Sequence, residues 1–249
     1  MNIGDEGTSA HLQASVDASR YVASINLRTA IGYVNQAFER WGLPKNIKID
    51  NGYPFVNPNN SDVPSKAKLW WIGLGINVIQ NTPRCPQQNG IVECLQGTIC
   101  SWSNPNKCTS IQNLQERIDK ESNFQRNQYR IPAKEYKTRI ELHPDLETNE
   151  RKYDPNKFDM NLVYEFLSNQ VWTRTIKKNG EIKHFGEWLY VGKGKGCIER
   201  KVDLTFDPQI LKWVIRKKDG TLLKETSKAV PSEKHIKEFA TMSKNSDTT

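Results

Sequence analysis

Several kinds of segment are missing from this chain of 249 residues. It has no uninterrupted run of about 18 apolar residues, so no transmembrane helix is predicted. The amino end, MNIGDEGTSAH, is polar and acidic, unlike the basic and then apolar start of a secretory signal. The five cysteines form no C-x-x-C pair, which argues against a zinc site and favours a reducing compartment. These absences predict a soluble, cytoplasmic protein that has no membrane partner.

The charge balance is uneven along the chain. The formal net charge is +8; residues 1–170 carry 19 lysines and arginines against 18 acids, whereas residues 171–249 carry 17 against 10. A basic C-terminal region beside a nearly neutral one indicates a polyanion as partner. A solvated basic face without any partner is the alternative that charge alone leaves open.

Two carboxylates stand at positions that suit metal ligands. Asp50 follows a short β-branched run, residues 47–49, and precedes an Asn-Gly turn pair. This order places it at the carboxyl edge of a sheet, where the ligand sites of open α/β sheets lie. Glu93 falls in the first turns of a helix predicted over residues 89–102, and carboxylates from two elements can share a cation such as Mg²⁺. Each acid also has a purely structural interpretation: Asp50 as a turn cap, and Glu93 as a first-turn acid favoured by the helix dipole.

The sequence around these two acids carries a resemblance. Asp50 stands in Ile-Asp-Asn-Gly, and Glu93 ends the pattern Pro-X-X-Pro-Gln-X-Asn-Gly-X-Val-Glu. The ordered string resembles the second and third acids of the DDE integrase/transposase catalytic core. Five residues fall at the spacing of that family: Pro83, Pro86, Asn89, Gly90 and Glu93. The resemblance covers residues 1–150 as core and the rest more loosely, and a polar loop over residues 56–65 accounts for a longer interval between the acids.

The resemblance implies an RNase H-like α/β fold, in which helices flank a mixed five-stranded sheet. It implies DNA integration or transposition by metal-dependent phosphodiester hydrolysis and strand transfer. Asp50 and Glu93 would be both catalytic and metal-binding residues, and the cofactor would be Mg²⁺ or Mn²⁺. The implied partners are DNA, as transposon ends and target, and further copies of the chain or other transposase subunits. Such a protein would act at the bacterial nucleoid.

The resembled family uses a third carboxylate, on its first strand, and no residue here matches it. The nearest candidate is Asp5, within a predicted Gly-Asp-Glu-Gly turn that leads into a strand over residues 9–16. A turn at that end lies several residues, at about 3.3 Å each, from the catalytic edge. We therefore expect a truncated core with its first strand largely missing and its activity impaired. The alternatives are a catalytically inactive DNA-binding remnant of a transposase, or another RNase H-like nuclease acting on RNA or structured DNA.

Hydrophobic periodicity predicts the remaining elements of the core, residues 1–130. Thr29 is the expected N-cap of a helix that continues to Trp41. Further strands are expected over residues 21–27 and 76–79, and further helices over residues 66–74 and 110–129. The tryptophan pair in the 66–74 helix is expected in the core rather than stacked on bases.

The C-terminal region has a different pattern. Residues 131–165 form a predicted linker or arm. Short strands joined by Asn-Gly and Asp-Gly turns predict a small, basic, antiparallel SH3-like β-barrel over residues 166–235, which would bind DNA. Within it, Gly-Lys-Gly-Lys-Gly at residues 192–196 fits either a phosphate clamp or a flexible turn. Residues 236–249 form a predicted disordered tail.

Overall fold

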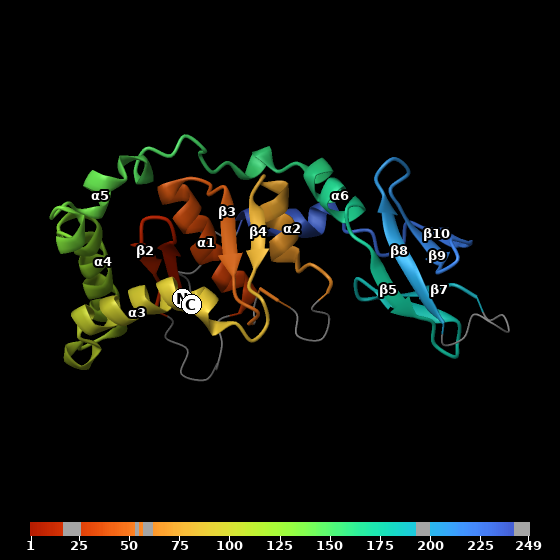
Figure 1. Ribbon diagram of the computed structural model, residues 1–249, viewed down its shortest axis with the longest axis horizontal. Coiled ribbons are helices and arrows are strands. Elements are labelled where there is room, and N and C mark those ends of the chain that lie inside the picture. The colour runs from red at the N-terminus through yellow and green to blue at the C-terminus, as the bar shows by residue number, and fades with distance from the viewer. Residues whose placement is uncertain (17–25, 53–54, 57–61, 193–199, 242–249) are drawn as a thin grey trace. The chain divides into compact units, whose positions relative to one another are not determined.

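The computed structural model describes residues 1–16, 26–52, 55–56, 62–192 and 200–241. The chain divides into two compact units. Unit 1 comprises Met1–Val56, Val78–Asp154 and Phe239–Thr249, and unit 2 comprises Asn57–Asn77 and Pro155–Glu238. Both combine helices with small sheets, so the chain is a mixed α/β protein (Figure 1). Within the described ranges, no helix combines the length and apolar character that crossing a membrane requires.

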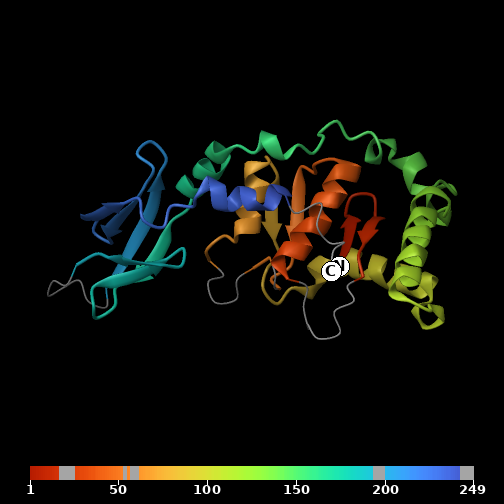
Figure 2. The ribbon, with the colours of Figure 1, turned by 180° about the vertical axis from the view of Figure 1, so that it is seen from behind.

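Unit 1 begins with a β-hairpin that packs on two helices. Strands β1 (Asn2–Asp5) and β2 (Ala10–Ala14) pair antiparallel. The hairpin lies beside α3 (Gly90–Ser103) and α4 (Ile111–Asn127) in both views (Figure 1, Figure 2). An apolar cluster between them has three buried side chains: Ala14, Ile99 and Ile118.

The second edge of β2 is covered by side chains of α4. The Gln115 amide donates to Ala14 O at 2.8 Å and accepts from Val16 N at 3.0 Å. Gln125 accepts from His11 N at 3.1 Å, and Arg126 donates to His11 O at 2.5 Å. These groups satisfy the backbone in the way that a neighbouring strand would.

The sequence prediction of one five-stranded sheet therefore does not describe unit 1. Its described residues form two sheets of two strands each, β1-β2 and β3-β4. The strand predicted over residues 21–27 lies outside the described residues except at its end, where Asn26 and Leu27 begin a helix instead. The physical reason lies in α4, whose glutamines occupy the edge on which another strand would add.

Helix α1 (Leu27–Trp41) is amphipathic, as its apolar periodicity predicted. Its N-cap is Asn26 rather than Thr29, because the Asn26 side chain accepts from the Thr29 backbone N–H at 2.9 Å. The helix ends at Gly42, whose positive φ of 78° suits glycine.

Strands β3 (Asn46–Ile49) and β4 (Asn77–Gln80) form the second sheet of unit 1. Their arrows point the same way in Figure 1, and the N–H of Asn81 donates to Ile49 O at 3.0 Å. The two strands therefore end side by side, and the residues that follow each strand share one edge of the sheet.

The remaining elements of unit 1 are short, and most of them lie in the predicted arm that begins at residue 131. Asn149 donates to Trp41 O at 3.0 Å, and Leu43 N donates to Arg151 O at 2.6 Å, so this segment is fastened to the end of α1. The short elements are η1 (Pro86–Asn89), η2 (Pro105–Lys107), η3 (Pro132–Lys134), α5 (Arg139–Leu142) and η4 (Pro144–Leu146).

Three helices of unit 2 pack together: α2 (Lys66–Gly73), α6 (Met160–Ser168) and α7 (Glu233–Lys237). Trp70 and Trp71 are fully buried, which confirms the prediction that this pair belongs to the core. The Trp70 ring stacks on Phe158 with centroids 5.2 Å apart. Gly73 leaves room for Phe158, because a Cβ at Gly73 would lie 2.1 Å from that ring. Two short 3-10 turns, η5 (Pro155–Lys157) and η6 (Glu238–Thr241), flank these helices in the chain.

The strands of unit 2 form a four-stranded antiparallel sheet and a separate hairpin. The sheet has the order β10 (Leu222–Thr226), β9 (Lys212–Lys217), β8 (Lys201–Asp207) and β5 (Trp172–Thr175). The hairpin pairs β6 (Glu181–His184) with β7 (Glu187–Tyr190).

The antiparallel strands predicted for this region are present, but they do not close into the expected SH3-like barrel among the described residues. Carbonyl groups of β7 do not pair with β10; Trp188 O and Tyr190 O instead accept from the ammonium groups of Lys228 and Lys224, at 3.0 and 2.8 Å. Lysine side chains thus take the place of a strand ladder at the point where a barrel would close.

Candidate active site

Asp50 is the first residue after β3. Ile49 before it is buried, whereas Asp50 itself is exposed. Its Oδ1 accepts from Gly52 N at 3.1 Å, which is the turn-capping contact that an Asp-Asn-Gly sequence favours. The Asp50 carboxylate therefore has a local structural role in the turn, and no described residue donates a hydrogen bond to its Oδ2.

Glu93 lies in the first turn of α3, which begins at Gly90. Its side chain is exposed and forms no hydrogen bond or ion pair with the described residues. An acid at this position is favoured by the helix dipole, and an exposed carboxylate without a partner is also available to a cation. The structure thus places both predicted acids on the surface of unit 1, and neither in an apolar core.

A hydrogen-bond chain ties the two elements together, and Asn81 is its centre. Asn81 directly follows β4 and is 5% exposed. Its backbone O accepts from the Asn51 amide at 2.9 Å, and its own amide donates to Asn89 Oδ1 at 2.5 Å. Gln80 adds a further contact, from its amide to Asn51 Oδ1 at 2.8 Å.

This chain connects the loop of Asp50 with the start of the Glu93 helix. Asn51 is the neighbour of Asp50, and Asn89 precedes α3. Glu93 follows Asn89 by four residues, a rise of about 6 Å along a helix. Hydrogen bonds therefore join the ends of β3 and β4 to the residue before α3, although no hydrogen bond among the described residues joins the two carboxylates directly.

The loop between β4 and α3 is held in shape by its own side chains. Gln88 Oε1 accepts from Thr82 N at 2.8 Å, and the Gln88 amide donates to the Thr82 hydroxyl at 3.2 Å. Together with the Asn81–Asn89 contact, these bonds fix where α3 begins. Asn89 accordingly shapes the loop that leads into α3.

Asn81 was not singled out from the sequence, although a signal existed. Like Asp50, it follows a short apolar strand directly, and such positions meet at one sheet edge. Its Oδ1 is buried and accepts no hydrogen bond from the described residues. A buried acceptor without a partner is costly to the stability of the fold.

The described residues supply no third acid to complete a metal-holding group with Asp50 and Glu93. Asp5 ends β1, and its Oδ2 accepts from Thr8 N at 2.7 Å within the β1–β2 turn. Among the described residues, no group of three His, Cys, Asp or Glu side chains is placed to hold a metal ion. Asp5 is therefore a turn residue.

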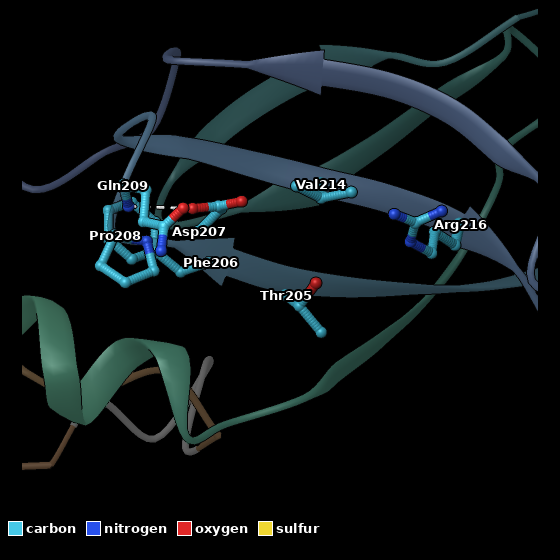
Figure 3. A pocket seen from close by; sticks show the side chains of 7 residues that line it. All are labelled: Thr205, Phe206, Asp207, Pro208, Gln209, Val214 and Arg216. Atoms are coloured by element: carbon cyan, nitrogen blue, oxygen red, sulfur yellow. Dashed lines mark hydrogen bonds between the residues drawn. The ribbon is translucent and has the colours of Figure 1, made fainter.

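A shallow cavity of about 380 Å³ lies on the β8–β9 ribbon of unit 2 (Figure 3). Figure 3 shows Asp207 turned toward Gln209 and Arg216 at the far end of the cavity. The Gln209 backbone N–H donates a hydrogen bond to Asp207 Oδ1 at 2.9 Å. Asp207 is thus used by the turn that follows β8, and neither predicted acid lines this cavity. The proposed phosphate clamp of residues 192–196 lies outside the described residues apart from Gly192.

Among the described residues, Cys85, Cys94, Cys100 and Cys108 are free thiols. No family model matches the chain, and a comparison with curated proteins finds no significant relative.

Proposed function

We propose that the chain is a DNA-processing protein of the DDE integrase/transposase type, with Asp50 and Glu93 as its metal-binding acids. The observation that carries the proposal is the hydrogen-bond chain from Asn51 through Asn81 to Asn89. It joins the loop of one acid to the start of the helix that carries the other, which supports the proposal that both carboxylates bind one cation.

The two carboxylates fit a magnesium ion. Mg²⁺ is commonly held by one or two carboxylates, with waters and substrate phosphates completing its shell. Asp50 Oδ2 and the Glu93 carboxylate would be its protein ligands. A bound divalent ion would supply Lewis-acid activation of the attacking oxygen and stabilisation of the leaving one at a phosphodiester.

The remaining polar groups of the site would position rather than react. Gly52 N fixes Asp50 through Oδ1, and Asn81 fixes the start of α3 and hence Glu93. The basic region beyond residue 170 would bind the DNA backbone, which makes its affinity fall as salt rises.

Nicking of supercoiled plasmid tests this proposal. The expected result is weak nicking that needs Mg²⁺ and disappears in both Asp50→Asn and Glu93→Gln. The matched control is Asp145→Asn, an exposed acid in η4 of the same unit, which should leave nicking unchanged. Nicking that survives in either Asp50→Asn or Glu93→Gln would contradict the assignment of these acids.

A second function is favoured by one specific observation, the lack of a third acid near the site among the described residues. Losing one ligand of a metal cage removes much of its electrostatic stabilisation of the transition state. The chain would then be a DNA-binding remnant that occupies transposon ends or a partner transposase subunit without cutting. Tight, salt-sensitive binding of DNA by a wild-type chain that never nicks supports this second function.

A further inference from the structure

The β6–β7 hairpin of unit 2 has two chemically different faces. Directly opposed residues share a face, so Ile182 with Leu189 points one way and Lys183 with Trp188 the other. Ile182 and Leu189 are buried. Trp188 is 38% exposed and Tyr190, on the same side, is 48% exposed, so the outer face displays two aromatic rings.

Lysines surround these rings. The Lys177 ammonium lies 4.1 Å from the Trp188 ring centroid, and the Lys183 ammonium lies 5.8 Å from it. Lys224 and Lys228 reach the carbonyls of the same strand. We call this surface, formed by Lys177, Lys183, Trp188, Tyr190, Lys224 and Lys228, the hairpin patch.

The hairpin patch has an excess of positive charge. Two acids contact or adjoin it: Glu187 pairs with Lys228 at 3.4 Å, and Glu181, opposite Tyr190, accepts from Asn179. Lys177, Lys183 and Lys224 form no ion pair within the described part of the chain. An anionic partner would therefore gain ion pairs with ammonium groups that no described acid neutralises.

The spacing of the rings indicates which anionic partner fits. Trp188 and Tyr190 are two residues apart on one strand, so their side chains leave the sheet about 6.6 Å apart. Successive bases stacked in duplex DNA follow at about 3.4 Å along each strand. Two neighbouring bases can each cover one ring only where the strand is unpaired and extended.

We propose that the hairpin patch binds a single-stranded segment of DNA. Trp188 and Tyr190 would stack on successive unpaired bases, and Lys177, Lys183 and Lys224 would contact the flanking phosphates. Aromatic rings set in a basic groove are the general means by which proteins hold unpaired strands without sequence preference. The choice of DNA rather than RNA rests on the proposed function; the stacking itself does not involve Asp50 or Glu93.

Fluorescence anisotropy of the full chain tests the inference. The probes are a labelled oligothymidine, a labelled duplex and a labelled oligouridine of equal length, with EDTA present to exclude metal-dependent cleavage. Trp188→Ala is expected to weaken binding of oligothymidine about 5- to 150-fold, the usual effect of removing one stacking ring. Duplex binding should change by less than about twofold, because phosphate contacts remain.

Two further variants separate stacking from a general loss of structure. Trp188→Phe keeps an aromatic ring and should retain most of the affinity, whereas Tyr136→Ala removes an exposed ring of unit 1 and should change nothing. The double variant Lys177→Gln, Lys183→Gln should lower the salt slope of oligothymidine binding by about 1.4, since each phosphate contact contributes about 0.7. Lys157→Gln, an exposed lysine elsewhere in unit 2, should leave that slope unchanged.

Three results would overturn the inference. They are an unchanged affinity of Trp188→Ala for oligothymidine, an equal loss on single strand and duplex, and tighter binding of oligouridine than of oligothymidine. Because EDTA removes the metal, the outcome is independent of nicking. A chain that binds single strands but never nicks would leave this inference intact and refute only the proposed catalysis.

Discussion

The core of unit 2 contains a histidine whose protonation should destabilise the fold. His184 is 1% exposed and lies between Trp172 and Trp213, with ring centroids 5.4 and 4.3 Å away. Neither ring nitrogen has a hydrogen-bond partner among the described residues. Burial, and secondarily the charge of Arg174, lower the pKa of His184 from 6.5 to about 3.

The sign and size of the effect follow from this shift. Below pH 6.5 the unfolded chain takes up a proton at His184, whereas the folded chain stays neutral until about pH 3. Acidification therefore stabilises the unfolded state, and stability is lost progressively over this window. Between pH 7 and pH 5 the loss from this one group is about 2 kcal/mol.

Urea unfolding followed by tryptophan fluorescence measures this loss. His184→Phe has no proton to bind, so its unfolding free energy should fall between pH 7 and pH 5 by about 2 kcal/mol less than that of the wild type. His11 is a matched comparison in unit 1, because burial and then Arg126 lower its pKa to about 4. Replacing His11 should leave the pH dependence of the unfolding free energy of unit 2 unchanged. Equal losses for the wild type and His184→Phe would refute the reasoning.

Two further predictions concern a buried hydrogen bond and the packing of a glycine. Asn81→Ala should cost about 1 kcal/mol in urea unfolding and reduce any Mg²⁺-dependent nicking, because it removes the bond to Asn89 Oδ1; unchanged nicking would contradict its positioning role. Gly73→Ala should destabilise the chain by about 1–3 kcal/mol, because its Cβ would meet the Phe158 ring at 2.1 Å. Gly97→Ala is the matched control on α3, where a Cβ meets nothing within 4 Å, and it should stabilise the chain by up to about 1 kcal/mol. If urea unfolding shows that Gly97→Ala is less stable than Gly73→Ala, the packing argument is refuted.

Local patterns predicted the elements that carry the candidate site. A β-branched run that breaks into Asn-Gly does end as a strand directly before Asp50, and Glu93 does lie in the first turn of a helix. Such features depend on residues close in sequence, whose backbone preferences act whatever the rest of the chain does. The burial of Trp70 and Trp71 follows in the same way from their apolar surroundings.

Contacts between distant residues decided the features that were predicted wrongly. Gln115 and Gln125 look like ordinary solvated residues of a helix, yet they occupy the edge of β2 that a third strand was expected to fill. The predicted barrel stays open for a similar reason, since Lys224 and Lys228 bind the β7 carbonyls. A long polar side chain can satisfy a backbone group as well as a strand can, and its own position does not reveal that it will.

The sequence by itself determined which residues could do chemistry here: two acids at element ends, and a basic C-terminal region. Only the tertiary structure decided that Asn81 links the surroundings of these acids, and that Trp188 and Tyr190 share one exposed face with unpaired lysines. The physical reason is the distance along the chain over which each kind of interaction acts. Turn and helix preferences act over a few residues, whereas a binding surface is made when folding brings together groups that lie far apart along the chain.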